Sequence, residues 1–269
     1  MATLLLVHAH PDDESISTGG VMMKAKEEGH RVVLISATRG EVGEIYNMDE
    51  AASRPHLGEI RTHELEEASR VIGVDRLEFL DYRDSGMVRT ADNEDPRSFH
   101  QAGLDEAARR LEAILREEQP EVVVTFGEDG AYGHPDHIKI HPVTNAALDE
   151  MARKSNSWSP RKLYYTALPR SLMQAFMSQM TDEMRAQMNP DMVFEGTPDE
   201  LITTQVDVTP FIARKREANQ AHLSQNDPDS WFSKIPEEAY EVVFGTEYYA
   251  LARGKPGSAL PEPDLLAGV

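Results

Sequence analysis

The sequence predicts an α/β fold: a Rossmann-like, mostly parallel sheet flanked by helices, with a smaller C-terminal extension or cap. Residues 3–9 form a short, continuous apolar run, which is typical of a strand buried on both faces. Residues 16–28 favour a helix that stops at Gly29, and residues 31–37 form a second apolar run. Strand, helix and strand in close succession indicate a βαβ unit and hence a parallel sheet.

The same alternation continues through the first two thirds of the chain. Residues 59–72 carry apolar side chains at helical spacing and end at Gly73. We expect further helices at 104–118 and 135–151, and strands at 77–80, 121–126 and 163–167. Beyond Pro169 the pattern changes to a Met-rich helical stretch at 171–188, a strand-like 201–206, a helix at 210–223 and a strand-like 242–251.

These elements suggest three parts. Residues 1–168 are expected to form the α/β catalytic core, and residues 169–255 a C-terminal extension packed on the same domain. Residues 256–269 are rich in proline and small side chains, so we expect a loose tail. The length of 269 residues fits one large α/β domain. The sequence indicates no oligomeric state.

Composition excludes several classes of function. The chain has 27 Lys and Arg against 47 Asp and Glu, a net charge of −20, which argues against nucleic acid or an anionic membrane as partner. It has no cysteine, so disulfide scaffolds, thiolate metal sites and thiol catalysis are excluded. The first apolar run is too short for a signal sequence or a membrane span, and we expect a cytoplasmic protein.

A histidine and three carboxylates follow the first predicted strand. His10 is followed by Pro11 and then by Asp12, Asp13 and Glu14. Adjacent carboxylates raise one another's pKa unless a cation neutralises them, and imidazole with carboxylate suits a catalytic zinc ion. The alternative is an acidic helix N-terminus, which the helix dipole favours.

A second His/Asp cluster, residues 131–137, follows the strand predicted at 121–126. Both clusters follow parallel strands, so we expect them to meet at one edge of the sheet, where open α/β folds bind ligands. Spacing alone leaves open whether His134 or His137 binds a metal, and His137 with His141 is a rival pair. His8 is interpreted as a hydrogen-bonded support for the site. Long irregular stretches at 39–58 and 81–103 should shape the pocket.

These residues resemble the LmbE-like (PIG-L) family of zinc-dependent N-acetylglucosaminyl deacetylases. The resemblance is strongest to its mycothiol-metabolism branch, which includes an N-acetylglucosaminyl-inositol deacetylase and a mycothiol conjugate amidase. It rests on four segments: VHAHPDDES at 7–15, RDSGM at 83–87, GAYGHPDH at 130–137 and AHLSQ at 221–225.

The resemblance implies a role for each matching residue. It makes His10, Asp13 and His137 the ligands of Zn²⁺, although such a site also accepts Fe²⁺ or another divalent metal. Six further residues take roles by the same match. Asp12 is the general base, His134 the group that is protonated or stabilises charge, and Asp136 the residue that orients His134. Tyr132 contacts the reacting carbonyl, while Arg61 and Asp84 hold the sugar and its attached group. One departure concerns Ala131, where relatives often have a second glycine, so the freedom of the Tyr132 loop is in question.

The expected reaction is hydrolysis of an N-acetyl group on an N-acetylglucosaminyl compound, a small sugar-amide substrate. Water activated by zinc and by Asp12 attacks the acetamide carbonyl. The alternatives are an amidase that cleaves a mycothiol-like S-conjugate, a phosphoester hydrolase, and a non-catalytic sugar-binding α/β protein. The phosphoester reading needs more carboxylate ligands than the two motifs offer, and a complete ligand set beside Asp12 argues against the non-catalytic reading.

Overall fold

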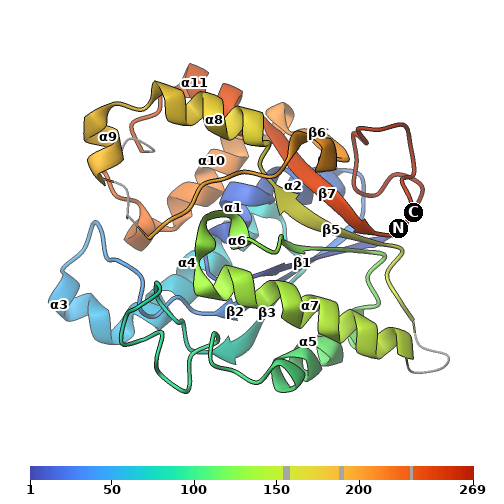
Figure 1. The fold of residues 1–269 in the computed structure, drawn as a ribbon, viewed down its shortest axis with the longest axis horizontal. Helices are drawn as coiled ribbons and strands as arrows, with labels where there is room; N and C mark the ends of the chain where they lie inside the picture. The colour runs from blue at the N-terminus through green and yellow to red at the C-terminus, as the bar shows by residue number, and fades with distance from the viewer. Residues whose placement is uncertain (154–157, 188–190, 231–232) are drawn as a thin grey trace.

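The structure is a computed structural model that describes residues 1–153, 158–187, 191–230 and 233–269. Its described residues contain one seven-stranded sheet with helices on both faces (Figure 1). The strands are β1 (Thr3–His8), β2 (Arg31–Thr38), β3 (Arg76–Tyr82), β4 (Val122–Phe126), β5 (Lys162–Ala167), β6 (Thr204–Asp207) and β7 (Thr246–Arg253).

The helices lie between these strands along the chain. They are α1 (Asp13–Ser17), α2 (Gly19–Glu27), α3 (Glu50–Ser53), α4 (Leu57–Ile72), α5 (Leu104–Glu118), α6 (Gly130–Gly133), α7 (Pro135–Arg153), α8 (Arg170–Gln179), α9 (Asp182–Gln187), α10 (Ile212–Ala221) and α11 (Glu237–Phe244). Short 3₁₀ turns occur at Arg54–His56, Asp199–Leu201, Thr209–Phe211 and Leu223–Gln225.

The strand order is β3-β2-β1-β4-β5-β7-β6. The first five strands pair in parallel, and β7 pairs antiparallel with both β5 and β6. The chain winds from β1 outward to β3, then returns to place β4 on the other side of β1. The sheet order therefore reverses between β1 and β4, and the crevice at the carboxyl ends of those two strands is the favoured ligand site of such folds.

Alternate residues of the central strand serve two hydrophobic cores. Leu4 and Leu6 of β1 pack with residues of α2, α4 and α10 on one face. Leu5 and Val7 pack with residues of α5 and α7 on the other face (Figure 1). Burial on both faces explains why this strand is apolar at nearly every position rather than at every second one.

The α/β class and the mostly parallel sheet are confirmed. The helix predicted at 104–118 is α5, with the same bounds. The strand-like interpretation of 242–251 is wrong in its first part, because residues up to Phe244 belong to α11. That helix begins after Pro236 and closes where the Gly245 amide donates to the Glu241 carbonyl, so the apolar run is divided between a helix and a strand. The helix predicted at 171–188 is divided into α8 and α9, and residue 188 lies outside the described residues.

The C-terminal residues differ from the expected loose tail. Glu262 is fully buried and its carboxylate accepts a hydrogen bond from Lys162 at 2.8 Å and from the Tyr164 hydroxyl at 2.6 Å. Leu265 and Leu266 join the core on the α2 side. The tail is held because Glu262, Leu265 and Leu266 are buried, a property that proline and glycine content does not reveal. The described residues include no helix with the length and apolarity needed to cross a membrane.

Candidate metal and catalytic site

The two predicted clusters meet at the carboxyl edge of β1 and β4. His10 follows the end of β1, and Asp13 begins α1. His134 and His137 lie at the start of α7, which follows β4 through the short helix α6. Because β1 and β4 are hydrogen-bonded neighbours, the sheet brings residues more than a hundred positions apart into contact.

Three polar atoms converge in the arrangement expected of metal ligands. Nδ1 of His10 lies 3.1 Å from Nε2 of His137, which lies 3.2 Å from Oδ1 of Asp13. The other Asp13 oxygen, Oδ2, is 4.0 Å from Nδ1 of His10. Ligand atoms around a tetrahedral zinc ion are separated by roughly 3.4 Å, given bonds of ~2.0–2.1 Å. All three side chains are buried, so the donor set fits a cation that they enclose.

The charges around this set are strongly coupled. Burial opposes ionisation of Asp13, but His137 and His10 hold the pKa of its carboxyl well below the ordinary range. Burial likewise opposes a charge on His10, but Asp84, Asp136 and Asp13 raise its pKa well above the ordinary value. Oδ2 of Asp13 also accepts hydrogen bonds from the amides of Ala9 and His10, which fixes the carboxylate at the end of β1.

The second nitrogen of His10 faces a different carboxylate. Nε2 lies 3.1 Å from Oδ2 of Asp136 and 3.5 Å from Oδ1 of Asp84. Asp136 also accepts hydrogen bonds from the amide of Ser85 at 3.0 Å and from the Ser85 hydroxyl. Although His10, Asp84 and Asp136 also form a group close enough to bind a cation, their oxygens already accept protein hydrogen bonds. We therefore expect a metal on the Nδ1 side of His10, where Oδ1 of Asp13 faces His137.

The side chain of Asp136 does not orient His134, contrary to the expectation from the sequence. Its carboxylate contacts His10, and only its backbone amide reaches His134, donating to Nδ1 at 3.2 Å. The reason is that Asp136 is the second residue of α7. Its amide has no acceptor within the helix and can donate to His134, while its side chain faces His10. Because Nδ1 of His134 accepts this bond, the ring proton of the neutral histidine is on Nε2.

His134 also belongs to the histidine group. Its ligand atom and those of His10 and His137 lie within 4.8 Å of one another. Burial and the neighbouring His10 and His137 lower the pKa of His134 to about 2. In this structure His134 is therefore a neutral ring that can donate from Nε2.

Asp12 lies beside the ligand set in an unusual backbone conformation. Its φ is 107°, in the region that favours glycine, and its side chain is 27% exposed. Burial of its surroundings raises the pKa of Asp12 to about 6, against the opposing effect of Arg61. Asp12 is thus a partly exposed carboxylate at a site where Asp13, Asp84 and Asp136 are buried.

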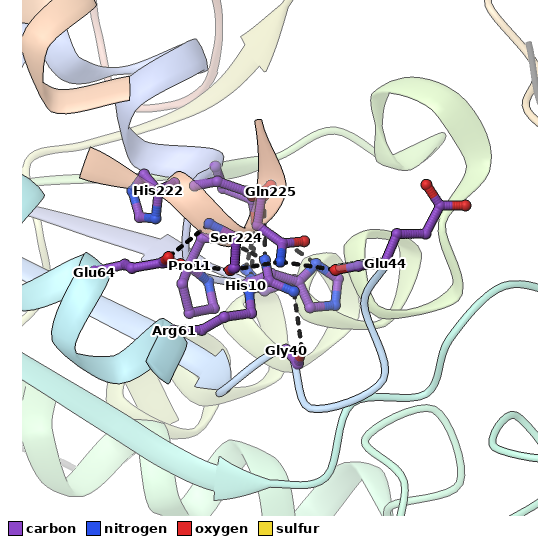
Figure 2. A network of polar contacts seen from close by, with 12 residues as sticks. His10, Pro11, Gly40, Glu44, Arg61, Glu64, His222, Ser224 and Gln225 are labelled. Carbon is purple, nitrogen blue, oxygen red and sulfur yellow. Dashed lines mark hydrogen bonds and ion pairs between the residues drawn. The ribbon is translucent and has the colours of Figure 1, made fainter. Parts of the chain in front are cut away.

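Arg61, expected to hold the sugar, directs its donors to the protein. The guanidinium donates to the carbonyls of Gly40 at 2.9 Å and Pro11 at 2.5 Å, and to Oδ2 of Asp12 at 3.1 Å (Figure 2). It is 3% exposed, and a Cβ at Gly40 would lie 2.2 Å from its Nη1. Arg61 is therefore a buried side chain whose hydrogen bonds hold Asp12 and the backbone next to it in place.

Asp84, the other residue expected to hold the sugar, is also covered. It is buried beside His10, and Oδ1 accepts the amide of Gly86 at 2.9 Å. Burial opposes its charge, but His10 holds the pKa of Asp84 below the ordinary range. A contact of Asp84 or Arg61 with substrate stays a prediction.

Tyr132 covers the histidines from the side of α6. Its ring packs edge-on against His137 at 4.9 Å and against His134 at 6.2 Å. Burial raises the pKa of its hydroxyl well above the ordinary value, so the group remains a proton donor. The preceding Ala131 has φ 66° and ψ −52°, a conformation that glycine adopts far more readily.

The segment that follows α10 forms contacts near the site that residue types and spacing did not predict. Nε2 of His222 lies 2.7 Å from Oε1 of Glu14, and both side chains are buried. Ser224 donates to Glu64 through its amide and its hydroxyl, each at 2.6 Å (Figure 2). Gln225 donates to the carbonyl of Glu44 at 3.0 Å. The only sequence signal for these contacts is the resemblance of residues 221–225 to the same segment of the family.

Two other histidines lie outside the ligand set. Nε2 of His8 pairs with Oγ1 of Thr18 at 2.9 Å, and its ring packs on Phe126, so it supports the helix that follows the site. Nδ1 of His141 faces the carbonyl of Phe126 at 3.1 Å, so the pair of His137 and His141 does not form a site.

The two long loops line a cavity of about 660 Å³, and no residue of the two His/Asp clusters belongs to its lining. Its lining includes Arg39, Glu41 and Val42 from one loop and Arg83 and Asp92 from the other. Oε2 of Glu41 accepts the amide of Asp84 at 3.0 Å, which joins the cavity wall to the neighbour of His10.

Comparisons with known proteins agree with this geometry. The family model PIG-L (GlcNAc-PI de-N-acetylase) matches residues 5–148. A 1D-myo-inositol 2-acetamido-2-deoxy-α-D-glucopyranoside deacetylase of Thermobifida fusca is 40% identical, covering 97% of this chain and 94% of that protein. The deacetylase of the same name from Acidothermus cellulolyticus is 42% identical over 99% and 95% of the two chains. The fold is similar to N,N'-diacetylchitobiose deacetylase from Pyrococcus horikoshii, with a TM-score of 0.65, 21% identity, and coverage of 93% and 83%.

Proposed function

Because the chain belongs to the PIG-L family of de-N-acetylases, we propose that it hydrolyses the acetamide of 1D-myo-inositol 2-acetamido-2-deoxy-α-D-glucopyranoside. The products are acetate and the free amine of the sugar. The observation that carries this proposal is the position of Asp12, a partly exposed carboxylate next to a buried cluster of two imidazoles and one carboxylate. The full-length relatives named for this reaction support the choice of substrate.

His10 through Nδ1, His137 through Nε2 and Asp13 would hold a divalent metal, and we propose zinc. Bound zinc would lower the pKa of water towards ~7 and polarise the acetamide carbonyl. The fit rests on the three buried donor atoms described above and on the absence of thiolates from the sequence. Asp136 completes the arrangement by accepting from Nε2 of His10, which leaves Nδ1 free.

Each proton transfer and hydrogen bond of the proposed reaction is assigned to a residue of the chain. Asp12 takes the proton of the attacking water, and Arg61 keeps its carboxylate in place during this step. The Tyr132 hydroxyl and Nε2–H of His134 are donors for the acetamide oxygen as its negative charge grows. When the C–N bond breaks, Asp12 returns to the amine the proton that it took from water.

The decisive experiment measures amine release from three substrates: the inositol glycoside named above, free N-acetylglucosamine and a mycothiol S-conjugate. Zinc-loaded protein is compared with a chelated sample and with Asp12→Asn. We expect release from the inositol glycoside that chelation abolishes and that D12N lowers by about 10²–10⁴-fold. Release only from the S-conjugate would identify an amidase instead. One bound zinc without cleavage of any amide would refute the proposed substrate, and no bound zinc would refute the ligand set.

A further inference from the structure

Asp12 is held from both sides of its backbone. With φ at 107°, it occupies a conformation that is strained for a non-glycine residue. Its amide donates to Oε2 of Glu14 at 2.9 Å, and its carbonyl accepts from the hydroxyl of Ser15 at 2.9 Å. These two bonds fix the peptide groups on either side of the residue whose carboxylate is exposed at the site.

Both partners of Asp12 are in turn held by the last turn of α10 and the residue after it. Nε2 of His222 donates to Oε1 of Glu14 at 2.7 Å, and Nδ2 of Asn219 donates to Oγ of Ser15 at 3.4 Å. Glu14 and Ser15 are almost fully buried, as is His222, and Asn219 is 8% exposed. Two hydrogen-bond relays therefore link the end of α10 to Asp12, more than two hundred residues away in sequence. One runs from His222 through Glu14 to the Asp12 amide, and the other from Asn219 through Ser15 to the Asp12 carbonyl.

We infer that Asn219 and His222 are positioning residues for Asp12: acting through Ser15 and Glu14, they keep its backbone in the strained conformation that presents the carboxylate to the attacking water. This inference rests on the proposed function of Asp12 as the general base. The side-chain hydrogen bonds of Asn219 and His222 go to Ser15 and Glu14, and not to the proposed metal ligands.

The expected consequence follows from the strain. Without the bond from His222, Glu14 loses its fixed partner, and the Asp12 peptide can relax towards negative φ. The carboxylate then moves relative to the reacting carbon, and a displacement of about 1 Å costs roughly 10²-fold in rate. Substrate binding depends on other groups, so KM should change little.

The test compares His222→Ala and Asn219→Ala with a matched control on the same helix. Lys215 is also buried on α10 and forms an ion pair with Glu247 at 2.6 Å, but it has no link to Asp12. Lys215→Met therefore removes a buried polar contact of α10 without touching the relays. We expect kcat to fall about 10- to 100-fold in H222A and N219A, with KM within threefold of wild type. K215M should keep its kcat, and all variants should bind zinc with unchanged stoichiometry.

Two further measurements separate positioning from general damage. His222→Gln retains a donor at the place of Nε2 and should recover most of the kcat lost in H222A. A crystal structure of H222A should show Asp12 at negative φ. A kcat for H222A and N219A within twofold of that for K215M, or an unchanged φ of Asp12 in H222A, overturns the inference. If wild-type protein releases no amine, the proposed function fails, while the φ of Asp12 still decides whether His222 positions it.

Discussion

Oδ2 of Asp136 lies 3.1 Å from Nε2 of His10, which makes Asp136 the partner of a proposed metal ligand rather than of His134. A carboxylate behind a ligating histidine fixes the ring and increases its basicity. The bond links the two sequence motifs directly, since His10 comes from the first and Asp136 from the second.

Asp136→Asn should therefore weaken zinc binding. A neutral amide is a poorer acceptor for Nε2–H of His10, so we expect the dissociation constant for zinc to rise about 10- to 100-fold. Competition with a chromogenic chelator measures it. Asp105→Asn, an exposed carboxylate in the first turn of α5, is the control. Equal zinc affinity in D136N and wild type would contradict the proposed ligand geometry.

Arg61→Lys distinguishes the two interpretations of Arg61. If Arg61 holds Asp12 by donating to Pro11, Gly40 and Asp12, the substitution should lower kcat. The single ammonium of lysine cannot reproduce the planar guanidinium that bonds all three acceptors. We expect kcat to fall about 10-fold or more with KM nearly unchanged. A rise in KM at constant kcat would instead show that Arg61 binds the sugar. Steady-state kinetics with the N-acetylated inositol glycoside as substrate decides between them.

Ala131→Gly should stabilise the protein. A residue with a Cβ is strained at φ 66° and ψ −52°, and glycine relieves the strain at some cost in the entropy of the unfolded chain. The net gain in the free energy of unfolding should be about 1 kcal/mol, measured by urea denaturation. Gly133→Ala, at φ 90°, is the converse variant and should destabilise. A lower urea midpoint for A131G would show that the loop is not strained there.

The ion pairs of Glu118 predict a dependence of stability on pH. Glu118 is 6% exposed in its side chain and contacts Arg31 at 2.8 Å and Arg76 at 2.6 Å. The hydrogen bond from Arg31, against the effect of burial, lowers the pKa of Glu118 below its ordinary 4.5. The folded protein thus binds this proton less readily than the unfolded chain, so the contribution is complete above pH 4.5 and declines as the pH falls through the lower folded pKa.

Glu118→Gln should accordingly lower the free energy of unfolding at pH 7 by about 1 kcal/mol, a value limited by the partial exposure of Arg31 and Arg76. Urea titrations of both proteins from pH 7 down to the acid limit of folding measure the difference. It should be constant above pH 4.5 and shrink below it. A difference that grew on acidification would contradict the assigned sign.

The centre of the sheet was predictable from the sequence because β1, β2 and β4 are buried on both faces and stand out as continuous apolar runs. The meeting of the two His/Asp clusters followed from parallel strand order. By contrast, Val242, Val243 and Phe244 have the composition of a strand, yet they end α11, since the residues before them are good helix formers and tertiary contacts decide the rest.

The side-chain contacts of the site could not be predicted from the sequence, for a different reason. Sequence spacing gives the side of the sheet on which a residue lies, but not which atom its side chain contacts. It therefore could not show that Asp136 faces His10, that Arg61 turns inward, or that Asp12 has a positive φ. The pairing of Glu14 with His222 joins distant parts of the chain, and no local pattern encodes such a contact.

The buried tail also protects the sheet. β6 is an outer strand, and the backbone of Glu262 pairs with it: the amide of Glu262 donates to the Thr203 carbonyl, and the Gln205 amide donates to the Glu262 carbonyl. These are the groups that an unprotected outer strand offers to a second molecule. By occupying them, the last residues of the chain guard against edge-to-edge aggregation, so a protein truncated at residue 255 is expected to lose solubility before it loses its fold.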